Sequence, residues 1–394
     1  MNKSTTRLYF IDAIRAWAIL MMLQGHFIDG LLDNTFRDNS NIFFSVWKYF
    51  RGITAPVFFT VSGFIFTYLL IKVPQTGWAN PRVKKGIKRG IELLVIGYLL
   101  RMNFLGLLKG EIYESFYLVD VLHCIGLSIL GILAIYLLSN RGKQWLFPSL
   151  LLISTLILFV FEPYYKTQSF SLFPQWLANY FTKTNGSVFT IIPWFGYTAF
   201  GSFISILFAK YKDHKHLYTG SISLFMIIGL TLIFYSSDFF LALSNYSGIT
   251  LFSDIFYNNY LFIRLGNVLL VFSVFMLFRQ FLTNKTGLRL GQSTLSIYVI
   301  HFMILYGSLT GLGLYRFFHH SLHPIIAILG AVVFMIISSY LALRYEDHKV
   351  RIKQSAAHAL NIAKFQLEKI LFISLDMFRS LFNSIIRLFG FVKN

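Results

Sequence analysis

The sequence predicts an all-α, polytopic membrane protein, and three observations lead to this fold class. The chain has 394 residues, of which 56% are hydrophobic and only 13% are charged, whereas about a quarter of the residues in a soluble protein are charged. Segments of about 20 mostly apolar residues, long enough to cross a bilayer as a helix, recur along the chain. Loops rich in Lys and Arg alternate with loops poor in them, which is typical of a multi-pass protein.

Ten segments are expected to span the membrane: residues 9–31, 50–71, 90–108, 119–138, 145–162, 188–209, 218–241, 260–282, 293–314 and 323–344. The basic loops, which include Lys3, Arg7, Arg141 and a cluster at 82–89, fall on the same side as both ends of the chain. Both termini are therefore expected in the cytoplasm, and the protein in the inner (cytoplasmic) membrane. Residues 1–345 form the expected transmembrane domain, and residues 346–394 form a basic cytoplasmic tail.

The tail contains a second kind of helix. Within residues 371–390, the polar side chains of Asp376, Arg379, Asn383 and Arg387 recur every three or four residues and so share one helix face. An amphipathic helix of this kind lies in a membrane interface, where its cations favour an anionic inner leaflet. The segment is therefore predicted to lie on membrane lipid. An eleventh span and a partner-binding helix are the alternatives.

Composition excludes several other classes of protein. A net charge of +19 would indicate nucleic-acid binding in a soluble protein, but here the cations lie in short loops and the tail, where they orient the spans. No nucleic-acid partner is expected. The single cysteine, Cys124, excludes an intramolecular disulfide and a cysteine-based zinc cluster. The apolar run behind the basic N-terminus is interrupted by charge and lacks a small-residue cleavage site, which predicts an uncleaved first span rather than a signal peptide.

The first span carries four ionisable residues in the stretch FIDAIRAWAILMMLQGHFIDG, namely Asp12, Arg15, His26 and Asp29. At 100° per residue, the eleven steps from Arg15 to His26 return to almost the same face, about 16 Å further along the axis. Each basic residue has an acid three positions away. Charged groups at membrane depth are costly and normally face a partner or a cavity. Two local ion pairs that hold the bundle together are the alternative, but a functional cavity is favoured.

The four ionisable residues form a charged stripe along one face of the first span. This stripe suits a reaction that needs a proton acceptor at one end of the substrate and an anion-binding group at the other. Histidine accepts a proton near neutral pH, and Asp29 would fix the tautomer of His26 and raise its basicity. Arg15 is too far away to share that step, but its guanidinium could bind an anionic group, such as a phosphate, on a long substrate.

The pattern of Asp, two residues, Arg, ten residues and His resembles the first span of the acyltransferase-3 family. The stretch FIDAIRAW…LQGHFID is more similar to the bacterial relatives of heparan-α-glucosaminide N-acetyltransferase. Further similar stretches follow in order: APVFFTVSGF (55–64), KRGIELLVIGYLLR (88–101), VLHCIGLSIL (121–130), IIPWFGYTAFG (191–201) and LGQSTLSIYVIHF (290–302). Ala16 replaces the usual glycine, and a family arginine pair is represented only by Lys85, Lys88 and Arg89.

The resemblance implies a transmembrane acyltransferase. Such an enzyme moves an acetyl or other acyl group from cytosolic acyl-CoA to an amine or hydroxyl of an extracytoplasmic sugar or glycan. It implies His26 as the catalytic base, or as an acyl carrier, with Asp29 in support. The CoA phosphates would bind Arg15, Lys85, Lys88 and Arg89.

Four further residues are candidates for substrate binding: Arg51, His123, Arg264 and His301. A structural hydrogen bond is the alternative for either histidine, and snorkelling to the interface is the alternative for Arg51. Trp194 is interpreted as an interface-belt aromatic.

A transporter or flippase is the competing function, because intramembrane charge also marks ion pathways. The chain lacks the internal repeat and the paired interrupted spans that transporters show, which favours an enzyme. The external histidines His319, His320 and His323 have no carboxylate near them in the sequence, so no metal is expected.

Overall fold

A computed structural model describes residues 8–140 and 142–388. Three residues of the predicted basic loops, Lys3, Arg7 and Arg141, lie outside the described residues, as does the last part of the tail. Within these ranges the structure assigns helices and no strands. Two isolated β-bridges pair Leu32 with Leu322 and Asn103 with Leu309. The predicted all-α class is confirmed.

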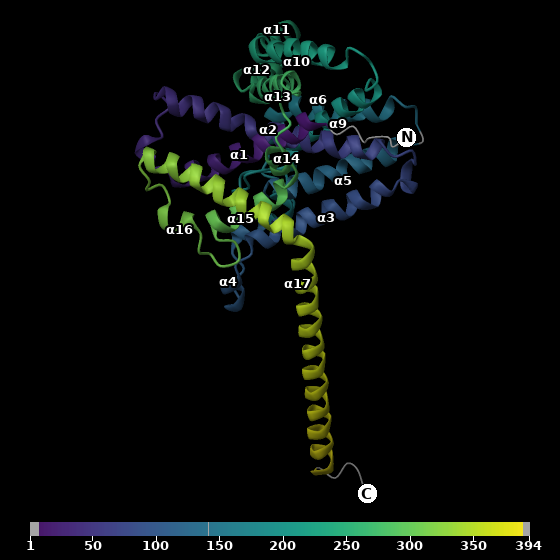
Figure 1. Ribbon diagram of the computed structural model, residues 1–394, viewed down its shortest axis with the longest axis vertical. Coiled ribbons are helices and arrows are strands. Elements are labelled where there is room, and N and C mark those ends of the chain that lie inside the picture. Colours follow the sequence, from purple (N-terminus) through teal and green to yellow (C-terminus); the bar gives the residue numbers. More distant parts are fainter. Residues whose placement is uncertain (1–7, 141, 389–394) are drawn as a thin grey trace. The chain divides into compact units, whose positions relative to one another are not determined.

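The helices of the described chain are α1 (Tyr9–Leu31), α2 (Ile42–Ile71), α3 (Pro81–Arg101), α4 (Phe104–Leu108), α5 (Val121–Ser139), α6 (Leu146–Val160), α7 (Glu162–Lys166), α8 (Gln175–Ala178), α9 (Ile191–Lys210), α10 (Leu217–Phe234), α11 (Ser236–Ser247), α12 (Thr250–Tyr257), α13 (Tyr260–Leu277), α14 (Lys285–Gln292), α15 (Thr294–Tyr306), α16 (Leu314–Phe318) and α17 (Pro324–Leu388). Three short 3₁₀ turns accompany them: η1 (Asn34–Phe36), η2 (Gly77–Ala79) and η3 (Glu114–Tyr117). In Figure 1, the long helices α1, α2, α3 and α5 lie along a common direction, and α10 to α13 form a group beside them.

Seven helices in the described ranges are long and apolar enough to cross a membrane, and a bent pair, α14 and α15, would make an eighth. The seven contain α1, α2, α5, α9, α10, α13 and α17. Two expected spans do not reach that standard. The third, 90–108, is broken at Met102, between α3 and α4, and the first half of α3 is basic. The fifth, α6, has only 15 residues. The count of ten spans stays a prediction that requires α3 and α6 to cross as well.

Aromatic and aliphatic side chains form the core between four helices. From α1 come Phe10 and Ile14, from α2 Phe64, from α9 Phe208 and from α13 Phe272, each at most 6% exposed. Two glycines allow α2 and α9 to meet backbone to backbone. A Cβ at Gly63 would overlap the carbonyl oxygen of Thr198, and a Cβ at Gly201 would overlap that of Thr60. Small residues of this kind permit close approach of helices in a membrane.

A third close approach joins the start of α1 to α14. A Cβ at Gly291 would overlap the carbonyl oxygen of Asp12. The chain bends by 73° between α14 and α15, with Ser293 at the break. The start of α15, at Thr294, therefore lies next to the first turns of α1.

The chain divides between Leu341 and Ala342 into two compact units, and α17 contains the boundary. The second unit is helical as far as Leu388, and its large apolar side chains, such as Phe372 and Phe378, are exposed. The segment 371–388 is therefore helical. Its position on a lipid surface, and the cytoplasmic position of both termini, stay predictions.

Candidate active site

A cavity of ≈ 200 Å³ lies near the end of α1 that carries His26. Four helices supply its larger polar side chains: His26 from α1, Arg51 from α2, Trp194 from α9 and Arg264 from α13. Apolar side chains from α1 and α2 and from the loop before α9 complete the wall, among them Met22, Phe58, Phe59, Val188 and Phe189. Three of the predicted site residues, His26, Arg51 and Arg264, thus share one cavity.

The imidazole of His26 is hydrogen-bonded to that of His301 on α15. The Nδ1 atom of His26 lies 3.1 Å from Nε2 of His301, and His301 is fully buried. Tyr306 at the end of α15 packs edge-on against His26, with ring centroids 6.1 Å apart. Because Nδ1 is taken up by His301, the Nε2 atom of His26 is the ring nitrogen left for a ligand in the cavity.

Asp29 is bonded to two arginines. Its Oδ1 accepts from Arg37 Nη2 at 2.7 Å, and its Oδ2 accepts from Arg51 Nη2 at 2.5 Å. Arg37 also donates to the backbone carbonyl of Asp29. The sequence predicts Asp29 as the hydrogen-bond partner that orients His26, but the observed hydrogen-bond partner of His26 is His301. Asp29 lies near enough to His26 to interact with it electrostatically, and its direct contact is with the Arg51 side chain that lines the cavity.

At the other end of the α1 stripe, Arg15 joins α1 to α15. Its Nη2 donates to Oγ1 of Thr294 at 3.0 Å, and its Nη1 lies 3.8 Å from Oδ1 of Asp12. Arg89 of α3 is close enough for its positive charge to act on Arg15. Arg89 itself pairs with Glu92, with 3.8 Å between Nη1 and Oε2.

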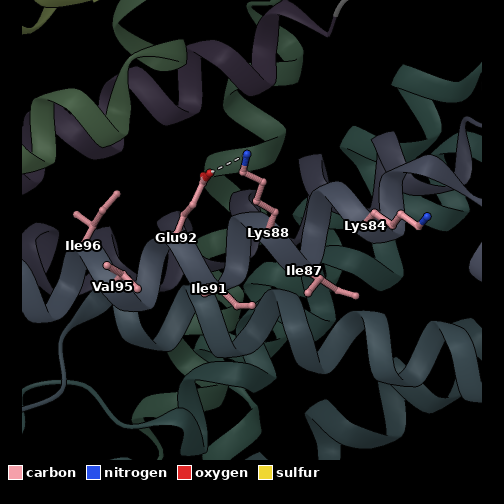
Figure 2. A pocket seen from close by; sticks show the side chains of 7 residues that line it. All are labelled: Lys84, Ile87, Lys88, Ile91, Glu92, Val95 and Ile96. Atoms are coloured by element: carbon pink, nitrogen blue, oxygen red, sulfur yellow. Dashed lines mark ion pairs between the residues drawn. The ribbon is translucent and has the colours of Figure 1, made fainter. Parts of the chain in front are cut away.

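A shallow, open groove of ≈ 570 Å³ lies on one face of α3 and is lined by side chains of this helix alone, which Figure 2 shows. Its residues recur at helical spacing, with Lys84 and Lys88 in the first half, then Glu92, and apolar side chains between and beyond them (Ile87, Ile91, Val95 and Ile96). Lys88 forms an exposed ion pair with Glu92, with 4.0 Å between Nζ and Oε1. Lys88, one of the predicted phosphate-binding lysines, lines this groove together with Lys84. Lys85, the other, does not line it.

The catalytic-region family model of heparan-α-glucosaminide N-acetyltransferase matches residues 7–238, more than half of the chain. The chain belongs to this family. As a member of this family of transmembrane acetyltransferases, with several long apolar helices, it is a multi-pass membrane transferase. No curated protein matches the chain.

The region matched by the acetyltransferase family contains Arg15, His26, Arg51 and the whole of α3, but not Arg264 or His301. The last quarter of the first unit therefore completes a site that the matched region begins. Arg37 and Thr294 are contacts that the sequence prediction missed, and neither had a signal in the sequence. Lys84 belongs to the basic cluster 82–89 that is expected to bind the CoA phosphates, and it lies four residues before Lys88 on the same helix face.

His123 lies outside the cavity wall. Its Nδ1 accepts from the backbone N–H of Asp120 and closes a capping box at the start of α5. Asp120 is in turn bonded to both Nε and Nη2 of Arg101, at 2.7 and 2.8 Å. His123 thus caps a helix, and its ring also packs edge-on against Tyr98 and Tyr180.

Trp194 differs from its sequence-based interpretation. It is 6% exposed, packs against Phe59 and Phe189, and lines the cavity, so it is not a lipid-facing belt residue. Its indole N–H has no hydrogen-bond partner among the residues that the structure describes. An unsatisfied buried donor in the wall of a cavity is an unusual feature.

No group of three or more His, Cys, Asp or Glu side chains in the described part of the chain is arranged to hold a metal. In the external histidine cluster, His320 Nδ1 lies 3.1 Å from the carbonyl oxygen of Leu32, and His319 and His323 pack against Tyr315 and Phe36. These contacts fasten the loop before α17 to the end of α1.

Proposed function

We propose that this protein transfers an acetyl or other acyl group from cytosolic acyl-CoA to an amine or hydroxyl of an extracytoplasmic sugar or glycan, in the inner membrane. One observation carries the proposal. His26 lines a cavity and has one ring nitrogen bonded to a buried histidine, while the other remains for a substrate. Membership of an acetyltransferase family supports the same reaction class.

In this proposal His26 is the general base. With its Nδ1–H donating to Nε2 of His301, the neutral ring of His26 has a lone pair on Nε2. The acceptor amine or hydroxyl gives its proton to that atom while it attacks the thioester carbonyl. The carbon–sulfur bond then breaks, and the CoA thiolate takes up the proton from His26. Asp29 acts indirectly, because it holds Arg51 beside the cavity.

The donor end is the opposite end of the α1 stripe. Arg15 and Arg89 offer two guanidinium groups to the CoA phosphates, and Lys88 and Lys85, joined by Lys84, add charge along α3. The groove on α3 combines lysines with an apolar floor, which suits a molecule that has phosphates and a long flexible arm. About 16 Å of α1 separates Arg15 from His26, so only an extended donor reaches both.

The test is acyl transfer by the full chain in lipid nanodiscs with radiolabelled acetyl-CoA. His26→Ala should lower the rate by about a hundredfold to ten-thousandfold, the effect of losing a positioned general base. Acetyl-CoA affinity, measured separately, should hardly change. His123→Ala is the matched control, because that histidine lies outside the cavity wall. Wild-type turnover in His26→Ala would refute the assignment, and a chain that does not bind acyl-CoA at all would favour the transporter alternative.

A further inference from the structure

The polar side chains that line the cavity beside His26, here called the outer cavity, are mostly hydrogen-bond donors. Arg51 and Arg264 carry only donors, and so does the indole of Trp194. His26 and Thr54 are the two lining side chains that have a nitrogen or oxygen acceptor, and Met21 and Met22 add only weakly accepting sulfur atoms. No Asp or Glu of the described ranges lines the cavity. A ligand that satisfies this wall must therefore supply acceptor oxygens.

Arg264 is the cation in this wall without a carboxylate partner among the described residues. Its guanidinium lies over the ring of Tyr260, 5.1 Å from the centroid, and against the backbone of Gly52. The hydroxyl of Tyr260 donates to Glu162 at 3.0 Å, and Lys166 pairs with the same carboxylate at 3.6 Å. Glu162 thus fixes the ring under Arg264, while its own charge is shared with Lys166.

The surroundings of the cavity add positive charge. Lys183 lies over the ring of Trp194, 5.9 Å from its centroid. Burial lowers the pKa of the Lys183 ammonium, and the charge of Arg264 lowers it further. Arg51 shares its partner Asp29 with Arg37. Since Asp29 and Glu162 each serve two partners, the cations around the cavity exceed the carboxylates.

We infer that the acceptor carries an oxyanion, a carboxylate, phosphate or sulfate, which Arg264 and Arg51 bind inside the outer cavity beside His26. The stem of Arg51 packs against Gly25, the residue before His26, so the anion and the reacting amine or hydroxyl belong to one small unit. The cavity is smaller than the about 300 to 1,000 Å³ of drug-sized sites, which limits that unit to about one sugar ring. This inference rests on the proposed function, because it concerns the acceptor of that reaction.

The experiment measures binding without the donor, on the full chain in nanodiscs. Glucosamine, glucosamine 6-phosphate, muramic acid and inorganic phosphate are the probes. The two sugars that carry an oxyanion, glucosamine 6-phosphate and muramic acid, should bind at least about tenfold more tightly than glucosamine, which corresponds to the free energy of one charge-assisted hydrogen bond. Inorganic phosphate should bind more weakly than glucosamine 6-phosphate, which separates a sugar-borne anion from a free one.

Arg264→Gln should reduce the preference for the sugars that carry an oxyanion to near equality, and Arg264→Lys, which keeps the charge but loses the planar fork, should leave part of it. Arg316→Gln, an exposed arginine outside the cavity wall, should leave the preference unchanged. Equal binding of sugars with and without an oxyanion, no binding of any sugar, or an unchanged preference in Arg264→Gln would overturn the inference. Acyl-CoA binding and its His26-dependent hydrolysis are measured in the same preparations, so a failure of the proposed function is recognised separately.

Discussion

The Nδ1 atom of His26 lies 3.1 Å from the Nε2 atom of His301, so one hydrogen bond joins a histidine of α1 to a histidine of α15. The two rings are tilted by 44°, with centroids 5.3 Å apart, and are therefore bonded edge to edge rather than stacked. A hydrogen bond of this kind determines both the orientation of the His26 ring and which of its nitrogens carries the proton.

We predict that His301 acts on the reaction through His26. His301→Leu removes the acceptor and should lower kcat roughly tenfold to a hundredfold, the usual cost of losing a partner that orients a functional histidine. His301→Gln keeps an acceptor near the position of Nε2 and should recover much of the rate. The KM for acyl-CoA should stay the same in both. Equal rates for the leucine and glutamine variants would mean that the bond is not used.

The Asp29→Asn variant should act through Arg51. Losing the charge weakens two partly exposed ion pairs, with an expected decrease of about 1 kcal/mol in the free energy of unfolding. The variant should also raise the acceptor KM more than it lowers kcat, because Arg51 is released beside the cavity. Steady-state kinetics at varied acceptor concentration measure this. A decrease in kcat without a change in the acceptor KM would instead indicate that Asp29 orients the imidazole of His26.

For the donor, Arg15→Ala should weaken acyl-CoA binding more than Lys84→Ala does. The Arg15 side chain is only 22% exposed, so its charge is screened less than that of an exposed lysine in the α3 groove. Binding by the wild type should weaken as salt concentration rises. Titration of acetyl-CoA by calorimetry tests both points. Unchanged affinity in Arg15→Ala would remove Arg15 from the donor site.

A matched pair of glycines on α14 tests the packing of that helix on α1. Gly291→Ala would place a Cβ on the carbonyl oxygen of Asp12 and should destabilise the protein by about 1 to 3 kcal/mol, as overpacking does. Gly287→Ala, in the same helix, meets nothing within 4 Å and should be neutral or slightly stabilising. Thermal unfolding in one detergent compares the two. Similar stability of both variants would contradict the close contact.

Hydropathy was a good guide to the fold where one unbroken helix makes up most of a predicted span. The bounds of the first span agree with α1, and those of the eighth agree with the start of α13. It was a poorer guide where packing or charge intervenes. The helix α3 begins at Pro81, inside the basic segment, because Asn80 caps it and accepts from Arg82 N–H. The break at Met102 lies between two polar residues, Arg101 and Asn103, but a hydropathy window of about 20 residues averages them with the apolar residues further out.

The candidate site divides in the same way. Helical periodicity brings Arg15 and His26 onto one stripe, because both lie on one element whose geometry is known in advance. It cannot foresee that His301, which is 275 residues further along the chain, bonds to His26. It likewise cannot foresee that Arg37 competes for Asp29, since that contact depends on how the loop after α1 folds back. Partners on other helices are set by tertiary packing.

The two bonds between α1 and α15 have a thermodynamic consequence. Thr294 and His301 lie seven residues apart, two turns of α15 and about 10 Å, so they share the face that meets Arg15 and His26. A CoA phosphate that draws Arg15 away from Thr294 would release the start of the helix whose far end holds the His26 ring. The free energies of donor binding and of acceptor binding are then coupled, and this coupling is reciprocal. If a bound donor changes the affinity for the acceptor by some factor, a bound acceptor must change the affinity for the donor by the same factor. Thr294→Val removes the bond to Arg15 and should bring this factor towards one.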